Sequence, residues 1–464
     1  MKISIDFILK GYIKVNKKIS INGWVQTKRI TKFGISFISI YDGTCFKTFQ
    51  VIIKNNLKNY KKLLNLTTGC SVNITGLLVF SLGNKQNYEL KATNVKVIGW
   101  IKNPNLYPIT PKYHSKEYLR EIAHLRPRTN LISAISRIRH TLAYAIHKFF
   151  NKNGFFWIST PLITFIDTEG YSKMFKITTF NFKKIPYNNL GNVEFKKDFF
   201  GKKSFLTVSG QLTGEAYASS LSKIYTFGPI FRAENSNTNK HLSEFWMIEP
   251  EIAFASLQDI INLSEKLLKY IFKIIINKRI NDLYYLNKKN NIKNINLLIK
   301  FIFSKFEQFE YNEIIKILLK YNIKFKNPIK WGQDISTEHE QFLCEKYFKK
   351  PIVIKNYPKN IKAFYMRINN DYKTVSNMDI LFPGIGEIIG GSQREERLNI
   401  LDKRINEMKL IKKKYWWYRD LRKYGTVPHS GFGLGFERIL NYITGIKNIR
   451  DVIPFPRTPN ISNF

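Results

Sequence analysis

The chain of 464 residues has only three cysteines, Cys45, Cys70 and Cys344. They stand apart, with no CxxC spacing and no histidine cluster nearby, which argues against a disulfide framework and against a zinc site. The sequence has no run of about 18 or more uncharged apolar residues, so we expect no membrane span. The opening stretch, MKISIDFILKGY, carries charge throughout its short apolar part, and we therefore expect no signal peptide and a cytoplasmic location.

Acidic residues are scarce relative to basic ones. The chain has 75 Lys and Arg against 34 Asp and Glu, a formal net charge of +41. Such an excess favours a polyanionic partner such as nucleic acid. Lys, Asn and Ile are abundant even in tracts such as LNKKNNIKNINLLIK (286–300), and they share A/T-rich codons, so a biased genome is an alternative source of the charge.

The length suggests two or three domains. Residues 18–100 form short β-rich runs separated by turn residues, a pattern typical of a small closed barrel of the OB type, which often binds single-stranded nucleic acid. Three prolines, Pro104, Pro108 and Pro111, then indicate a hinge. We predict an OB-fold domain over 1–101 and a hinge over 102–125.

The remaining residues, 126–464, mix helices and strands. Apolar residues from Leu131 to Phe149 recur at helical spacing, and FFWISTPLIT is strand-like but interrupted by Pro161. Residues 257–325 are expected to form a helical, variable insertion, and 350–460 to form strands with a helix around 394–414. Because sheet and helices are segregated, we predict an α+β domain on a mainly antiparallel sheet flanked by helices.

A polar loop, FRAENSNTNKHLSEF (231–245), joins two apolar strand-like segments. Arg232 offers a planar fork for a carboxylate and a phosphate, and Phe245 offers a ring for a base. Glu234 can accept hydrogen bonds from amino groups, and His241 can reach the outer phosphates of a nucleotide. These residue types fit an adenine nucleotide, although a surface hairpin with ordinary salt bridges is the alternative.

A second segment, MDILFPGIGEIIGGSQREER (378–397), places Asp379 and Glu387 on either side of a Pro-Gly turn. Two carboxylates on neighbouring strand ends can hold Mg2+. Gly390 allows close approach of a substrate to the backbone, and Arg394 is a second fork for a carboxyl or amide group. A hairpin followed by a charged helix start is the alternative.

Two further segments contain polar residues close to apolar runs. In GFGLGFERIL (431–440), Arg438 lies on the first turn of an expected helix and can face a phosphate, although the segment lacks a Walker GK[ST] and a GxGxxG. In FLTVSGQLTGEAYA (205–218), Gln211 and Glu215 can bind an ammonium or an amide group. For the segment with Arg438, the alternative is a glycine-bearing strand that only packs closely. For Gln211 and Glu215, the alternative is a role in helix capping.

The order of these segments resembles that of the class II aminoacyl-tRNA synthetases, whose motifs 1, 2 and 3 match the helix and strand ending at Pro161, FRAE…HLSEF and GFGLGFER. The N-terminal barrel resembles that of the aspartyl, asparaginyl and lysyl subgroup. Four segments are similar in sequence to those of bacterial asparaginyl-tRNA synthetases: FLTVSGQL, YTFGPIFRAENSNT, PGIGEIIGGSQREER and YWWYRDLRKYGTVPHSGFGLGFER. The resemblance covers essentially the whole chain and is loosest over 280–325.

This resemblance implies an enzyme that activates L-asparagine with ATP to asparaginyl-adenylate. The asparaginyl group then passes to the 3′ terminal adenosine of tRNA(Asn), with release of AMP and diphosphate. It also implies a homodimer, Mg2+ dependence and no membrane partner. Three alternatives remain: an aspartyl or non-discriminating enzyme that charges both tRNAs, a non-catalytic RNA-binding paralogue, and a barrel-less amidating enzyme, which the N-terminal barrel argues against.

The resemblance also implies roles for the loop residues. Arg232 and Arg438 would be catalytic, the first bridging the amino-acid carboxylate and the α-phosphate and the second binding the γ-phosphate and one face of the adenine. Phe245 would stack on the other face. Glu234 would lie near the adenine end of ATP or the tRNA terminus, and His241 near the outer phosphates. Chemistry of this kind needs positioning and charge stabilisation rather than a general base.

Binding of the amino acid is assigned in the same way. Glu169 and Gln211 match the positions that bind the α-ammonium group, and Arg394 would receive the side-chain carbonyl. Related aspartyl enzymes carry a lysine three residues after the glutamine, where this sequence has Gly214 beside Glu215. Loss of a cation and gain of an acceptor favour a neutral amide over a carboxylate.

The metal and the anticodon complete the assignments. Asp379 and Glu387 would hold Mg2+, with Glu387 also contacting ATP. Arg29, Phe37 and Gln50 match barrel positions that stack on and read anticodon bases, with the central uridine as the expected target. Phe37 is alternatively a core strand residue.

The sequence departs from the family pattern at two places. The loop EGAGEMF of the family is EGYSKMF here (169–175), which makes it bulkier at Tyr171 and basic at Lys173. The arginine that usually precedes the motif 2 histidine is Lys240. Either change is expected to slow catalysis or relax specificity without removing a residue that the chemistry needs.

Overall fold

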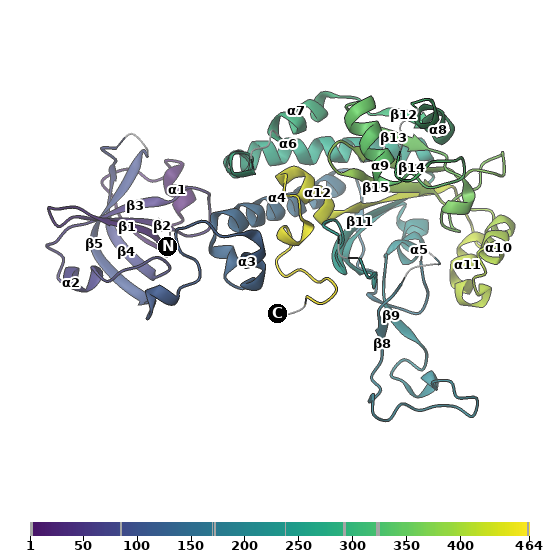
Figure 1. Cartoon of the computed structure of the whole chain (residues 1–464), viewed down its shortest axis with the longest axis horizontal. Coiled ribbons are helices and arrows are strands. Elements are labelled where there is room, and N and C mark those ends of the chain that lie inside the picture. Colours follow the sequence, from purple (N-terminus) through teal and green to yellow (C-terminus); the bar gives the residue numbers. More distant parts are fainter. Residues whose placement is uncertain are drawn as a thin grey trace. The chain divides into compact units, whose positions relative to one another are not determined.

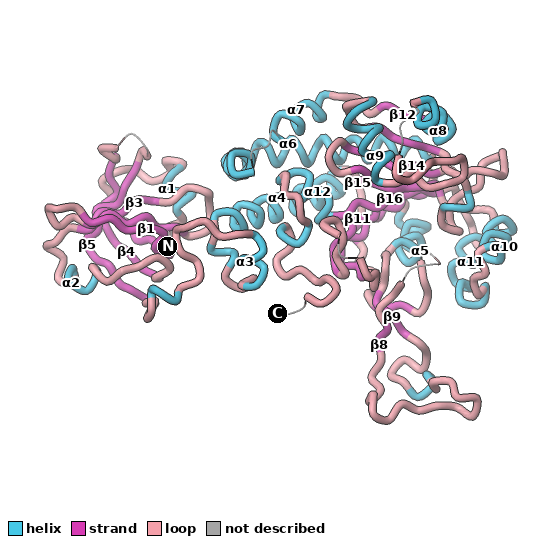
Figure 2. The backbone as a smooth tube through the Cα atoms, viewed as in Figure 1, coloured by secondary structure: helices cyan, strands magenta, loops and turns pink. Residues whose placement is uncertain are grey.

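The computed structural model describes residues 3–83, 86–168, 170, 173–236, 238–290, 294–321, 325–461 and 464. The chain divides into two compact units, residues 1–137 together with Phe464, and residues 138–463. We call them the barrel unit and the catalytic unit and describe each by itself. Figures 1 and 2 show their elements along the chain.

The barrel unit contains a closed five-stranded barrel with the strand order β1-β2-β3-β5-β4. Side chains alternate between inside and outside along each strand, so that Ile38, Ile40, Phe49 and Val51 fill the interior. Helix α1 packs Ile5 and Ile8 against this core. The predicted OB-type barrel is confirmed. Its elements are α1 (Ile5–Leu9), β1 (Lys18–Ile30), β2 (Ser36–Tyr41), β3 (Phe49–Ile53), α2 (Tyr60–Leu63), β4 (Ser71–Phe80) and β5 (Tyr88–Gly99).

Short helices follow the barrel over the proline-bearing segment. They are a 3-10 turn at Pro104–Leu106, α3 (Lys116–Glu121) and a second 3-10 turn at Arg126–Arg128. Ser115 caps α3 by accepting from the backbone N–H of Tyr118. Helix α4 (Asn130–Lys152) contains the expected apolar stripe, with Ile138, Leu142 and Ile146 buried.

An eight-stranded sheet forms the centre of the catalytic unit. Its middle pairs are antiparallel, and among the described residues only the outer pairs β12–β13 and β10–β6 are parallel. The expected α+β class with a mainly antiparallel sheet is therefore confirmed. The strands, in spatial order, are β12 (Glu307–Glu310), β13 (Ile352–Lys355), β14 (Asn377–Phe382), β15 (Gly386–Gln393), β16 (His429–Gly435), β11 (Glu244–Ala253), β10 (Lys223–Phe231) and β6 (Phe156–Trp157).

Helices cover this sheet. In Figure 1, α6 and α7 lie above it and α5, α10 and α11 lie below it. Helix α6 contacts β14, β15 and β16, whereas α5 contacts β10 and β11. The helix bounds are α5 (Gln211–Leu221), α6 (Leu257–Asn290), α7 (Asn294–Phe303), α8 (Tyr311–Lys320), α9 (Thr337–Gln341), α10 (Leu398–Glu407), α11 (Trp416–Lys423) and α12 (Phe436–Thr444). In the described part of the chain, no helix is both long and apolar enough to cross a membrane.

Two expectations about elements need correction. The stretch 257–325 is not wholly helical, because β12 adds an edge strand to the sheet beside β13. Glu310 ends that strand and starts α8 through a reciprocal capping box with Glu313. This capping box marks the start of a new helix, which the spacing of apolar residues alone does not reveal. The expected helix around 394–414 is shorter, and α10 begins only at Leu398.

The strand-like segment FFWISTPLIT is also divided. Pro161 separates β6 from β7 (Ile163–Thr164), and the two short strands belong to different sheets. Strand β7 joins β9 (Ser204–Leu206) and β8 (Lys176–Ile177) in a three-stranded sheet of order β7-β9-β8.

The barrel depends on a glycine where β4 meets β5. A Cβ at Gly76 would lie 2.3 Å from the backbone oxygen of Lys91, which cannot swing away as a side chain can. We predict that Gly76→Ala destabilises the barrel by about 1–3 kcal/mol. Hydrogen exchange of the β4 and β5 amides should become faster. Gly83→Ala is the control, since its Cβ meets only Ser81 Oγ at 3.7 Å; equal protection in both variants would contradict the packing argument.

Candidate active site

Two adjoining cavities lie in the catalytic unit, and they bring the predicted residues together. The smaller cavity, of about 190 Å³, is lined by all six residues assigned to ATP: Arg232, Glu234, His241, Phe245, Glu387 and Arg438. The larger, of about 450 Å³, is lined by Gln211, Asp379 and Arg394. Arg232, Glu234 and Glu387 line both, so the two spaces meet at these side chains.

The β10–β11 hairpin positions the first arginine. Phe231 pairs with Glu244 at the end of the ladder, and the backbone N–H of Arg232 donates to Ser243 O at 2.9 Å. The guanidinium of Arg232 lies 5.7 Å from the centre of the Phe245 ring. The cation and the aromatic ring thus flank one space, which suits a phosphate beside a planar base.

The second arginine comes from the other end of the chain. Arg438 lies in the first turn of α12, directly after β16, and its Nη1 donates to Glu387 O at 2.9 Å. His241 contacts Thr238 through Nδ1, and burial lowers the pKa of this imidazole. Lys240, the departure from the family pattern, donates to Ile385 O at 3.2 Å and lines the smaller cavity.

The two candidate metal ligands converge. Asp379 on β14 pairs with Gly390 on β15, and a Cβ at Gly390 would lie 3.0 Å from Glu387 Oε1 and 3.4 Å from Asp379 Oδ1. Burial and then the neighbouring Asp379 raise the pKa of Glu387, which a divalent cation would counteract. Carboxylate oxygens are the donors that Mg2+ prefers, so the residues fit that ion. Lys362 already neutralises part of the charge, since its Nζ lies 2.7 Å from Asp379 Oδ2.

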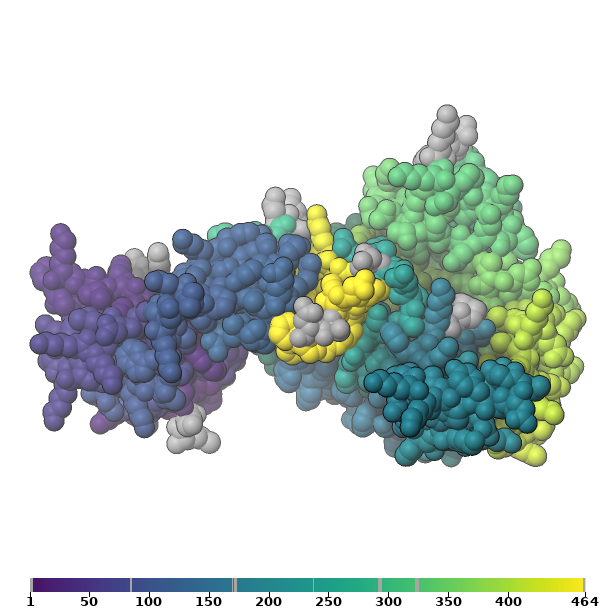
Figure 3. Space-filling model, turned by 60° about the horizontal axis from the view of Figure 1, so that its bottom comes forward, coloured from purple at the N-terminus to yellow at the C-terminus, as the bar shows by residue number. Residues whose placement is uncertain are grey.

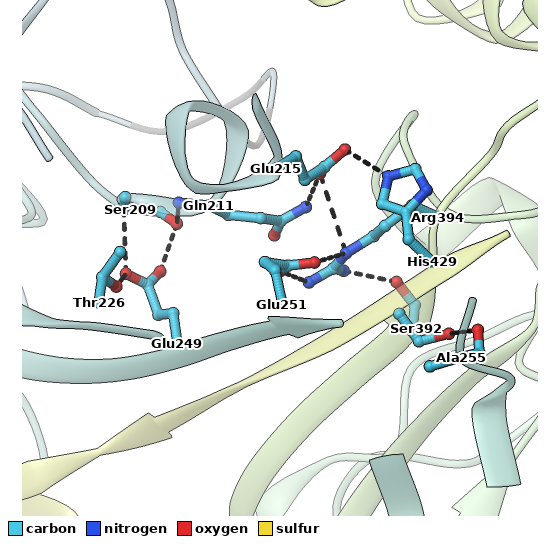
Figure 4. A network of polar contacts seen from close by, with 12 residues as sticks. Ser209, Gln211, Glu215, Thr226, Glu249, Glu251, Ala255, Ser392, Arg394 and His429 are labelled. Carbon is cyan, nitrogen blue, oxygen red and sulfur yellow. Dashed lines mark hydrogen bonds and ion pairs between the residues drawn. The ribbon is translucent and has the colours of Figure 1, made fainter. Parts of the chain in front are cut away.

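Arg394 is oriented by three neighbours. It binds the carboxylate of Glu251 through Nε, at 3.1 Å, and through Nη2, and its Nη1 donates to Ser392 Oγ at 2.7 Å (Figure 4). Glu251 is fully buried on β11. The guanidinium is therefore fixed at the wall of the larger cavity beside Tyr365, whose ring centre is 5.2 Å away.

Glu215 occupies a different place from the one expected. It does not line either cavity and instead lies behind Gln211 and Arg394, fully buried. Its carboxylate accepts from Gln211 Nε2 at 3.0 Å, Tyr418 Oη at 3.0 Å and Arg422 Nη2 at 2.8 Å. His429 Nε2 lies 2.9 Å from it (Figure 4). Burial opposes ionisation, but Arg422 and His429 outweigh it and hold the pKa of Glu215 well below its usual range.

Three other positions singled out in the sequence are Glu169, Tyr171 and Gly214. Glu169 and Tyr171 lie outside the described residues. Gly214 faces the sheet, because its Cβ would lie 3.2 Å from Ile224 Cδ1 and 3.7 Å from Thr226 Cγ2. The small residue thus lets α5 pack closely on β10.

The assigned anticodon residues lie on adjacent strands of the barrel. Arg29 and Phe37 are cross-strand partners, with the guanidinium carbon 5.2 Å from the ring centre. Gln50 Nε2 donates to Glu89 Oε2 at 3.1 Å. Phe37 and Gln50 alternate with the interior residues and point outward, so Phe37 is not a core residue.

Several residues of the site were not singled out in the sequence. Glu249 lines the larger cavity and accepts from Gly210 N at 3.0 Å and Thr226 Oγ1 at 2.9 Å. With Glu251 it forms the pattern EPE within the mostly apolar strand β11, and the period of two places both carboxylates on one face. The EPE pattern could therefore have identified both glutamates as candidate site residues from the sequence. The other site residues that were not singled out in the sequence are Glu251, Lys362, Arg422 and His429.

Comparisons with known proteins agree with this geometry. Residues 115–459 match the family model described as tRNA synthetases class II (D, K and N), and residues 19–98 match that of the OB-fold nucleic acid binding domain. The chain is 58% identical over 98% of both chains to asparagine–tRNA ligase of Pectobacterium atrosepticum. It is 57% identical, with the same coverage, to that of Serratia proteamaculans.

A solved structure is also similar. Asparaginyl-tRNA synthetase from Pyrococcus horikoshii, complexed with asparaginyl-adenylate, superposes with a TM-score of 0.86 at 31% identity, covering 100% of this chain and 99% of that one. The similarity extends over the whole length of both chains. The chain therefore belongs to the asparaginyl-tRNA synthetases, within the class II aminoacyl-tRNA synthetases that include the aspartyl and lysyl enzymes.

Proposed function

We propose that this enzyme activates L-asparagine with ATP in the two adjoining cavities and transfers the asparaginyl group to the 3′ terminal adenosine of tRNA(Asn). The observation that carries the proposal is the place of Arg232, at the junction of the ATP cavity and the amino-acid cavity. A guanidinium there can bind the carboxylate nucleophile and the α-phosphate together. The products of the two steps are diphosphate and AMP.

The remaining residues act by charge and position. Phe245 stacks under the adenine, and Arg438 and His241 face the outer phosphates. Asp379 and Glu387 would hold Mg2+, and the bound ion would supply neutralisation of phosphate charge. The two arginines stabilise the transition state without accepting a proton, in keeping with a reaction whose nucleophile is already an ionised carboxylate.

Selection of asparagine follows from the charge balance around Arg394. The positive charges of Arg394 and Arg422 are opposed by Glu215 and Glu251, all four of them buried. A neutral amide adds no charge to this set, whereas an aspartate carboxylate adds one that lacks its own partner. We assign Gln211 to the α-ammonium group and Arg394 to the side-chain carbonyl.

A homodimer is supported by an exposed aromatic surface at one edge of the sheet. Strand β6 is the last strand there, and Phe156 and Trp157 on it are more than half exposed. Trp157 contacts His147, which contacts Phe227, which contacts Trp246. Phe227 itself is buried, and it anchors the exposed rings of Trp157 and Trp246 to the core. Exposed aromatic side chains at a sheet edge are typical of subunit interfaces. In the barrel, we assign Arg29, Phe37 and Gln50 to the anticodon.

Replacing Arg232 tests the junction of the two cavities. Arg232→Ala should lower asparagine-dependent ATP–pyrophosphate exchange by at least about 10²-fold, because it removes charge stabilisation formed at the reacting groups. Binding of tRNA should remain measurable in a filter assay. Arg419→Ala is the control, an arginine paired with Asp402 away from both cavities. Retained exchange in Arg232→Ala would refute the assigned role.

Replacing Glu215 tests the charge balance around Arg394. Glu215→Gln keeps the volume but removes one buried negative charge, so the pocket becomes more positive. The ratio of kcat/KM for asparagine to that for aspartate should fall by about 10-fold or more. Glu265→Gln, on α6 beside Lys269, is the matched control. An unchanged ratio in a folded Glu215→Gln variant would rule out this explanation of selectivity.

A further inference from the structure

A long arm leaves the catalytic unit between β8 and β9. It comprises residues 178–203, and Figures 1 and 2 show it extending away from the sheet with little regular structure. Asp198 holds its base together, accepting from Thr179 N at 3.0 Å, Thr179 Oγ1 at 2.8 Å and Phe199 N at 2.8 Å. A bridge between Tyr187 and Val193 closes a turn near the tip. The arm is thus a built element rather than a loose loop.

The root of the arm is tied to the ATP-binding hairpin. Leu206 N donates to Phe175 O at 2.9 Å, and Phe231 N donates to Thr207 O at 2.9 Å. Ala233 N, next to Arg232, donates to Lys173 O at 2.8 Å. The arm therefore begins at the edge of the active site.

A groove of about 500 Å³ lies beside this root. Phe175, Leu206 and Phe231 form apolar parts of its wall, and Glu234 and Arg457 also line it. Glu234 lines the ATP cavity and the amino-acid cavity as well. The groove and the two cavities therefore share the side chain of Glu234.

The arm is basic. Six lysines stand against Glu194 and Asp198. Glu194 pairs with Lys197 at 2.7 Å, and Asp198 is used by the backbone of the arm itself. Among the described residues, Lys183, Lys184 and Lys196 are exposed and make no ion pair.

The arm also exposes aromatic rings. Phe182 is 80% exposed and Phe199 75%, and Tyr187 is 59% exposed. In Figure 3 the arm, in dark teal, lies at the front of the catalytic unit. Lysines interleaved with exposed rings are the combination with which proteins bind phosphates and stack on bases.

The abundance of lysine in the whole sequence does not account for these features together. Codon bias explains neither the exposed rings nor the attachment of the arm beside Arg232. A second copy of this chain is a poor match for a basic arm, because each chain itself has a net charge of +41. A polyanion is the complementary partner.

We propose that the arm binds the acceptor end of the tRNA, with Lys183, Lys184 and Lys196 on backbone phosphates and the groove at its root receiving the unpaired 3′ strand. The inference rests on the proposed transfer of asparagine to tRNA. It assigns to the arm a role in the second step of the reaction only. Activation of asparagine does not depend on it.

The test uses the triple variant K183A/K184A/K196A in the full chain. The KM for tRNA(Asn) in aminoacylation should rise about 10-fold or more, and the slope of log KM against log salt concentration should decrease by about 2–3, as three phosphate contacts are lost. Asparagine-dependent ATP–pyrophosphate exchange should stay at the wild-type rate. The control, K316A/K320A/K326A, removes three exposed lysines in and after α8, which lies at the opposite end of the catalytic unit in Figure 1.

The outcomes separate the possibilities. An unchanged KM and salt slope, or an equal change in the control variant, would overturn the assignment of the arm. A change of oligomeric mass in K183A/K184A/K196A with an unchanged KM would identify a second copy as its partner and overturn the proposal as well. Absence of exchange in the wild-type enzyme would instead contradict the proposed function.

Discussion

The buried carboxylate of Glu215 is the constraint on which the amino-acid pocket depends. Four side chains from three segments converge on it: Gln211 from α5, Tyr418 and Arg422 from α11, and His429 from β16. Removing one partner of such a buried ion pair costs about 3–5 kcal/mol, because the remaining charge is left uncompensated. The network therefore fixes α5 and α11 against the sheet, and with them Arg394, whose backbone N–H donates to His429 O at 2.8 Å.

The charged side chains of the smaller cavity, proposed to bind ATP, are positioned by the backbone of the sheet rather than by a buried network of ion pairs. Its charged groups come from the ends of sheet strands and from the first turn of α12, so the rigid ladder of β14, β15, β16 and β11 sets their spacing. Arg232 and Arg438 supply positive charge, and in the proposed mechanism Asp379 and Glu387 would supply the oxygens for a cation. Positioning of this kind stabilises a transition state without reorganisation of the groups during the reaction. The larger cavity shares walls with it, and in the proposed mechanism the two substrates therefore meet at Arg232.

Much of this was predictable because it is local in sequence. The alternation of apolar residues over 18–100 specifies the barrel, and the loop 231–245 contains its arginine and its aromatic ring within one hairpin. The role of Glu215 was not predictable, because its partners Arg422 and His429 lie about two hundred positions away and their side chains meet only in the folded chain. Strand β12 was missed for a related reason, since it is stabilised by pairing with β13 rather than by its own residues.

The central claim is that the charge balance behind Arg394 selects a neutral amide. The most direct measurement is ATP–pyrophosphate exchange by the wild-type enzyme with asparagine and with aspartate, under identical Mg2+ and salt. The account predicts exchange with asparagine and a kcat/KM for aspartate lower by about 10³-fold, the scale set by a buried charge without a partner. Equal exchange with both amino acids would contradict it.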